Sequence, residues 1–102
     1  MVLDARDFTI QAVNPAYKQL FAGREVKGLT LGDVIMGGDV DQLMKSLRKV
    51  VEDGQSMKTG ALLASVREVK NNDDRFVHTI VPVTDADSSS VDRLFIYSER
   101  AE

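Results

Sequence analysis

The segment Phe8–Gly23, with the sequence FTIQAVNPAYKQLFAG, joins an expected strand directly to an expected helix. Its first residues alternate, with Phe8, Ile10 and Ala12 on one face, which is the two-residue period of a strand. Asn14-Pro15 then favours a helix start, because asparagine accepts a hydrogen bond from a free amide and proline is tolerated in the first turn. We therefore predict a short strand that runs into a short helix ended by Gly23.

A longer helix is indicated over Asp39–Glu52, where apolar residues recur at the helical period of about 3.6 residues. Asp39 followed by Gln42 matches a capping box, in which both side chains satisfy free amides of the first turn. Gly54 stands where a glycine commonly stops a helix. Between the two helices, Gly28–Ile35 predicts a loop with one helical turn. The apolar face of the longer helix is formed by Val40, Leu43, Met44, Leu47, Val50 and Val51.

The second half of the chain predicts three strands joined by polar turns, over Thr59–Lys70, Arg75–Thr84 and Val91–Ser98. Two short strands precede the helices, at Val2-Leu3 and from Phe8 onward. This order predicts an α+β fold. We expect a five-stranded antiparallel sheet, with helices inserted between strands two and three and packed on one face.

Composition excludes several classes of function. At 102 residues the chain fits one domain, and its lack of cysteine excludes disulfides, thiolate metal sites and chromophores or flavin attached through sulfur. A net charge of −3 gives no electrostatic support for nucleic-acid binding. The longest run without a charged residue, Phe8–Tyr17, has ten residues, whereas a membrane-spanning helix needs about 20. We expect a soluble, cytoplasmic domain without membrane contact.

The last two expected strands are apolar on both faces, although an antiparallel sheet with one wet face alternates apolar and polar residues. Since the helices cover one face, something else must cover the other. We expect a second copy of the chain to do so, as a homodimer through the outer sheet face formed by Val77, Val81, Phe95 and Tyr97. The alternatives are a flanking helix, or Arg67 and Arg93 lying over the patch and keeping the chain monomeric.

The stretches FTIQAVNPAYKQLFAG, VKGLTLGDVI, GDVDQLMKSLRKVVEDG, FVHTIVPVTDAD and LFIYSE, in this order, form a series that resembles a PAS domain from Val2 to Glu99. The resemblance implies a sensory and interaction module that binds a small ligand between its helices and inner sheet face. It also implies a host such as a histidine kinase of a two-component system, a cyclic-dinucleotide enzyme or a transcription regulator. The flanking helices common in the family are missing, so we expect a fragment of a longer signalling protein.

The resemblance also sets which residues face inward, because PAS residues in register with the proline that ends the penultimate strand point into the cavity. The implied ligand-binding residues are His78, Phe76, Ile80, Val66, Leu94, Met44 and Leu47. His78 is the only histidine of the chain and would be the polar group that hydrogen-bonds a ligand carboxylate or carbonyl, or a pH-sensitive group. The alternative is a histidine at the edge of the core, satisfied by backbone or water.

The sequence does not identify a cofactor. Haem is not expected, because haem-binding PAS domains usually take their histidine from the long helix, and Asp39–Glu52 has none. Noncovalent flavin stays possible, although the inward residues offer few amide or hydroxyl groups. The sequence shows no nucleophile with a base and no metal triad, so we expect neither catalytic nor metal-binding residues. Two other functions remain: a PAS domain with a filled core that only dimerises, and a small α+β enzyme with an Asp or Tyr in a deep pocket.

Overall fold

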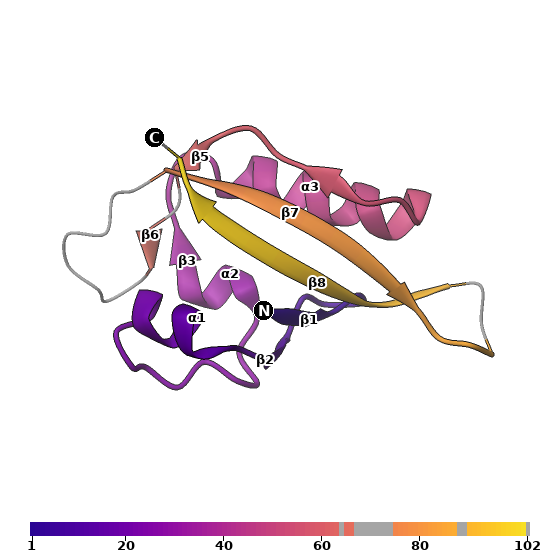
Figure 1. Cartoon of the computed structure of the whole chain (residues 1–102), viewed down its shortest axis with the longest axis horizontal. Helices are drawn as coiled ribbons and strands as arrows, with labels where there is room; N and C mark the ends of the chain where they lie inside the picture. The colour runs from indigo at the N-terminus through magenta and orange to yellow at the C-terminus, as the bar shows by residue number, and fades with distance from the viewer. Residues whose placement is uncertain (64, 67–74, 88–89, 102) are drawn as a thin grey trace.

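The computed structural model describes residues 1–63, 65–66, 75–87 and 90–101 of the chain (Figure 1). Its strands are β1 (Val2–Asp4), β2 (Ile10–Ala12), β3 (Ile35–Met36), β4 (Met57–Lys58), β5 (Leu62–Leu63), β6 (Ser65–Val66), β7 (Arg75–Thr84) and β8 (Val91–Arg100). Its helices are α1 (Pro15–Leu20), α2 (Leu31–Val34) and α3 (Val40–Asp53). The predicted order of two strands, then helices, then the remaining strands is confirmed, with the unpredicted two-residue strand β3 between α2 and α3.

The main sheet has the order β2-β1-β8-β7-β4, and every pairing in it is antiparallel. The long strands β7 and β8 form its centre, and Figure 1 shows them running side by side across the whole molecule. Because β5 pairs with the same strand as β4, the two pieces occupy the place of one interrupted edge strand. The predicted α+β fold with a five-stranded antiparallel sheet is therefore confirmed.

The third strand differs from the expected run Thr59–Lys70. It begins earlier, at Met57, and is interrupted between β4 and β5. At the interruption, Thr59 replaces a regular backbone pair: its amide donates to the His78 carbonyl at 2.8 Å, and its hydroxyl accepts from the His78 amide at 3.0 Å. Further on, β6 leaves the main sheet and pairs with β3. The prediction of one continuous strand was wrong, because hydrophobicity does not reveal a side chain that takes over a backbone hydrogen bond.

The short helix α1 begins as predicted. The Asn14 side chain accepts a hydrogen bond from the Tyr17 amide at 3.0 Å, and Pro15 occupies the first turn. The helix ends at Leu20, and the chain turns through Ala22 and Gly23, whose φ angles of 53° and 76° are left-handed. This short helix matters because Tyr17, on its buried face, reaches the central strand β8.

The long helix α3 has the predicted apolar face and ends at Gly54, which adopts the left-handed conformation at φ 68°. The predicted capping box at its start is wrong, because the Asp39 side chain makes no cap hydrogen bond. Instead, Asp39 Oδ2 accepts from the Leu63 amide at 2.7 Å and lies 3.9 Å from Arg75 Nη1. Asp39 therefore joins the start of α3 to the edge of the sheet.

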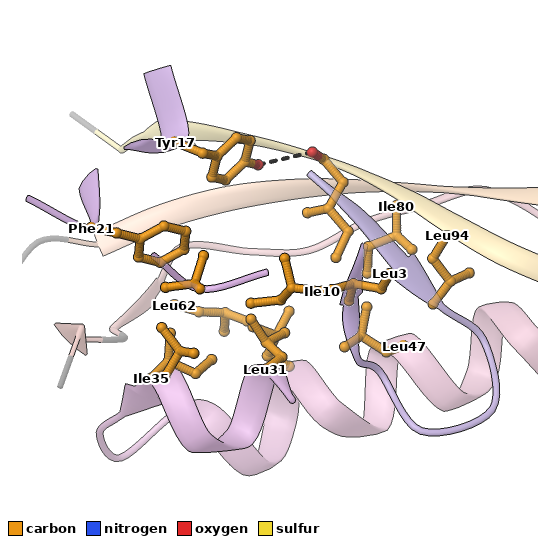
Figure 2. Close-up of a cluster of buried hydrophobic side chains, with 14 of the residues drawn as sticks. Leu3, Ile10, Tyr17, Phe21, Leu31, Ile35, Leu47, Leu62, Ile80 and Leu94 are labelled. Atoms are coloured by element: carbon orange, nitrogen blue, oxygen red, sulfur yellow. Dashed lines mark hydrogen bonds between the residues drawn. The ribbon is translucent and has the colours of Figure 1, made fainter. Parts of the chain in front are cut away.

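The core lies between the helices and one face of the sheet. α3 contacts β5, β7 and β8, and the side chain of Leu47 on α3 is fully buried. Figure 2 shows Leu47 beside Leu3, Ile80 and Leu94 at one end of the cluster, with Tyr17 and Phe21 at the other. The helices of the described residues are all too short or too polar to cross a bilayer.

We expect Asp39→Ala to lower the free energy of unfolding by about 1.5–3 kcal/mol, because it removes a charged acceptor from the partly buried Leu63 amide. The exposed Gln42 gives a matched control: Gln42→Ala should change stability by less than about 0.5 kcal/mol, since no capping box depends on it. Urea unfolding of both variants measures the difference. Equal losses of stability in the two variants would support the capping box and contradict the role of Asp39 in binding β5.

Candidate functional site

A chain of polar groups crosses the apolar core at one end of the sheet. His78 on β7 lies opposite Ser98 on β8, and His78 Nδ1 is 2.7 Å from Ser98 Oγ. Ser98 Oγ is in turn 2.8 Å from Tyr17 Oη, and Tyr17 Oη is 2.9 Å from the Ile96 carbonyl oxygen. Figure 2 draws the last of these hydrogen bonds. This series of hydrogen bonds links the two central strands, β7 and β8, to α1.

Counting protons along this chain assigns a direction to each hydrogen bond. Each hydroxyl carries one proton, and the Ile96 carbonyl only accepts, so Tyr17 donates to it. The Ser98 hydroxyl must then donate to Tyr17 Oη, and His78 Nδ1–H must donate to Ser98 Oγ. Burial raises the pKa of the Tyr17 phenol, which keeps its proton in place.

The same count leaves His78 Nε2 without a proton. Burial lowers the pKa of His78, so the ring is neutral near pH 7 and carries its single proton on Nδ1. Only 8% of the residue is exposed, and Nε2 has no hydrogen-bond partner among the described residues. An unpaired polar atom in a core costs about 1–3 kcal/mol. His78 Nε2 is thus a buried acceptor for which the described part of the chain offers no donor.

The structure separates the sequence-predicted ligand residues into two groups. His78, Ile80, Leu94 and Leu47 are buried on the inner side, as the predicted strand phase requires, and Phe76 and Met44 are half-buried. The side chain of Val66 lies outside the described residues. Phe76 is beside His78, with ring centroids 6.4 Å apart, whereas Ile80, Leu94 and Leu47 belong to the apolar cluster under α3.

Two residues of the hydrogen-bond network around His78, Tyr17 and Thr59, were not recognised from the sequence. Tyr17 was expected only as part of the short helix, and Thr59 only as the start of a strand. A buried tyrosine hydroxyl needs a hydrogen-bond partner, and Ser98 is a hydroxyl residue in an otherwise apolar inward row, so these two residue types were the available signal. The contact between Tyr17 and Ser98 joins residues 81 positions apart, which no local pattern reveals.

The predicted outer-face residues lie on the side of the sheet away from the helices. Phe95 is 39% exposed and Tyr97 60% exposed, and both are large apolar side chains. Val77 and Val81 are half-buried beside them. A separate hollow of about 370 Å³ lies at the end of α3, lined by Val51, Glu52, Asp53, Gly54, Ser90 and Val91. It is far along the sheet from His78 and involves none of the predicted ligand residues.

Comparisons with known proteins agree on the fold. A family model described as PAS fold matches residues 1–101. Among solved structures, the PAS-B domain of Drosophila melanogaster Cycle is similar: a tryptophan-to-alanine variant with bound glycerol has a TM-score of 0.80, and the wild type with bound ethylene glycol 0.79. Each is 11% identical and covers 98% of this chain and 96% of its own. A search of curated proteins finds no match.

We expect Tyr17→Phe to lower the free energy of unfolding by about 1–2 kcal/mol, because it removes the donor to the Ile96 carbonyl and the acceptor for Ser98. Tyr97→Phe is the matched control, since its hydroxyl lies on the exposed face, and it should cost less than about 0.5 kcal/mol. The double variant Tyr17→Phe, Ser98→Ala should lose less stability than the sum of the losses in the two single variants. Additive losses would show that the hydroxyls act independently.

Stability should fall in mildly acidic solution because of His78. The unfolded chain binds a proton at the ordinary histidine pKa of 6.5, whereas the buried ring binds it only at lower pH. Below about pH 6.5 the unfolded state therefore holds more protons, and the free energy of unfolding decreases as the pH falls. Above about pH 6.5 both states are unprotonated at His78, and this decrease is absent. Denaturant unfolding between pH 8 and 5 measures the decline, with His78→Gln expected to reduce it.

The difference between wild type and His78→Gln isolates the histidine. The partly buried Met1 amino group, whose pKa is also lowered by burial, contributes equally to both proteins. Should the variant not fold, NMR titration of the His78 ring in the wild type provides the answer directly. A ring pKa at or above 6.5 would contradict the burial argument.

Proposed function

Since the chain belongs to the family of PAS domains, which are generally non-catalytic sensor modules of signalling proteins, we propose that it senses a small molecule through His78. The proposal places it, as a non-enzymatic cytoplasmic module, in a histidine kinase of a two-component system, a cyclic-dinucleotide enzyme or a transcription regulator. The single observation that carries the sensing role is the buried Nε2 acceptor, which has no donor among residues 1–63, 65–66, 75–87 and 90–101. Buried polar atoms are normally paired, so such an atom at the inner sheet face marks a place for a ligand group.

The chemistry of Nε2 determines the class of ligand. An unprotonated ring nitrogen accepts a hydrogen bond and does not donate one. A ligand carboxylate or carbonyl, which the sequence led us to expect, would place two acceptors against each other. The ligand we propose therefore presents a hydroxyl or N–H group and is neutral, because an ion would lose its hydration at a buried atom such as His78 Nε2.

The hydrogen-bond chain offers a path from the ligand to the rest of the molecule. Thr59 holds the His78 backbone from both its amide and its hydroxyl, so the backbone is restrained while the ring can respond. A donor at Nε2 polarises the ring and alters the bond from Nδ1–H to Ser98, and neighbouring hydrogen bonds in a chain respond together. Ser98 and Tyr17 carry that change to β8 and α1, the elements we propose as the output.

A second function is favoured by the tight packing of the core. Ile80, Leu94 and Leu47 are completely buried and fill the space under α3 where the ligand residues were expected. This observation supports a PAS domain with a filled core that acts only by association. The two functions differ in whether a donor compound reaches His78 Nε2.

NMR of the protein labelled with ¹⁵N in its histidine separates them. Before any addition, we expect the ring to carry its proton on Nδ1. Ethylene glycol and glycerol, the compounds present in the two similar PAS-B structures, are suitable donor probes. Titration should move the Nε2 resonance in the direction of an accepted hydrogen bond and leave the Nδ1 proton in place. Native mass spectrometry of the purified protein should then detect any bound compound of the same class.

The matched control probe is 1,2-dimethoxyethane, which keeps the ethylene glycol skeleton but has no hydroxyl proton and should leave Nε2 unchanged. Ser98→Ala should alter the Nδ1 resonance, because Nδ1–H loses its acceptor. A ring protonated on Nε2, or an Nε2 resonance that ignores both diols at molar concentration in a protein that carries no compound, would overturn the sensing function and favour the filled core.

A further inference from the structure

The inner face of the sheet becomes more exposed toward one end. Along β7, exposure rises from the completely buried Ile80 through His78 at 8% to the half-buried Phe76. The residues opposite these three on β8 follow the same order and end with the exposed Arg100, which pairs with Phe76. Figure 1 shows this end of β8 beside the start of β7, near β5. The surroundings of His78 are therefore closest to solvent at this end.

Arg100 and Phe76 are in contact with each other at this end. Arg100 Cζ lies 6.0 Å from the centroid of the Phe76 ring, and a guanidinium over an aromatic face is attracted by the charge distribution of the ring. The centroid of the Phe76 ring is in turn 6.4 Å from that of the His78 ring. A guanidinium, a phenyl ring and an imidazole thus follow one another from the exposed end of the sheet toward its buried middle.

The other sides of His78 are harder to open. At the edge of the sheet, Thr59 makes two hydrogen bonds to the His78 backbone. On the side of α1, the Tyr17 hydroxyl makes two hydrogen bonds to β8. Toward the middle of the sheet, Ile80 is completely buried. Opening any of these sides breaks hydrogen bonds or exposes the core, whereas moving Arg100 needs only the rotation of an exposed side chain.

We propose that Arg100, stacked on the Phe76 ring, is the gate of the His78 site, and that a small molecule reaches Nε2 when the guanidinium leaves the ring. That such a molecule acts as a ligand rests on the proposed sensing function, whereas the route itself does not. The gate also selects by charge, because a cation at the entrance repels other cations. A neutral alcohol or amide passes it, and a protonated amine is disfavoured.

Chemical modification of Nε2 measures access without any ligand. Diethyl pyrocarbonate transfers its ethoxycarbonyl group to an unprotonated imidazole nitrogen, and His78 is the only histidine of the chain. A cation–π contact at an exposed position favours the closed gate by about two- to fivefold. Arg100→Ala should therefore raise the modification rate by about two- to fivefold, measured by mass spectrometry of the peptide that contains His78. Phe76→Leu should do the same, and the double variant should add little to either single change.

Arg93→Ala is the matched control, because Arg93 is an exposed arginine on the other face of the same strand, and it should leave the rate unchanged. Asp39→Ala tests the competing route, since it loosens the Leu63 amide at the edge strand β5. An unchanged rate in Arg100→Ala, an equal rise in Arg93→Ala, or a larger rise in Asp39→Ala would overturn the gate. So would a rate that climbs steeply in dilute urea, because the reagent would then act on the unfolded chain.

The gate and the sensing function can fail separately. If only the gate is wrong, Nε2 still responds to ethylene glycol while the modification rate ignores Arg100→Ala. If only the sensing function is wrong, Nε2 ignores the diols while Arg100→Ala still raises the rate. Selection by charge is tested with 2-aminoethanol, which keeps one hydroxyl and is positively charged at pH 7. It should shift the Nε2 resonance less than ethylene glycol does, and Arg100→Ala should reduce that difference. Equal shifts in the wild type would overturn the selection.

Discussion

The antiparallel pairing of β7 with β8, in the register that sets Ile80 opposite Ile96, is the constraint on which both faces of the molecule depend. On the inner face it brings His78 opposite Ser98, and on the outer face it brings Val81 opposite Phe95. A slip of one residue would turn every side chain of one strand to the other face. It would remove the polar chain from the core and expose Ile96 and Leu94.

The polar chain is a costly feature in a core built of leucine, isoleucine and valine. Its hydroxyls are satisfied in one direction, from His78 through Ser98 and Tyr17 to the Ile96 carbonyl, and the ring nitrogen at its beginning is not. An apolar residue in place of His78 would avoid that cost. The sensing function that we propose would use this acceptor and would account for the cost.

The inner and outer faces of the sheet also differ in the groups they present. Inside, burial keeps the His78 ring neutral, and Nε2 has no hydrogen-bond partner among the described residues. Outside, Phe95 and Tyr97 form an exposed aromatic surface on β8. β8 belongs to both, because successive residues of a strand point to opposite faces. Ser98 on the inner face therefore lies between Tyr97 and Glu99 on the outer face.

The sequence alone determined the order of the elements, the apolar face of α3, the start of α1 at Asn14 and the burial of His78, Ile80 and Leu94, since these follow from local spacing and from the family resemblance. Only the tertiary structure decided that Asp39 binds Leu63 instead of capping α3, that Thr59 interrupts the edge strand, and that Tyr17 completes the chain to His78. Each of these hydrogen bonds joins residues at least 19 positions apart. A polar side chain has several possible partners, and the fold selects among them by distance, which a linear pattern does not contain.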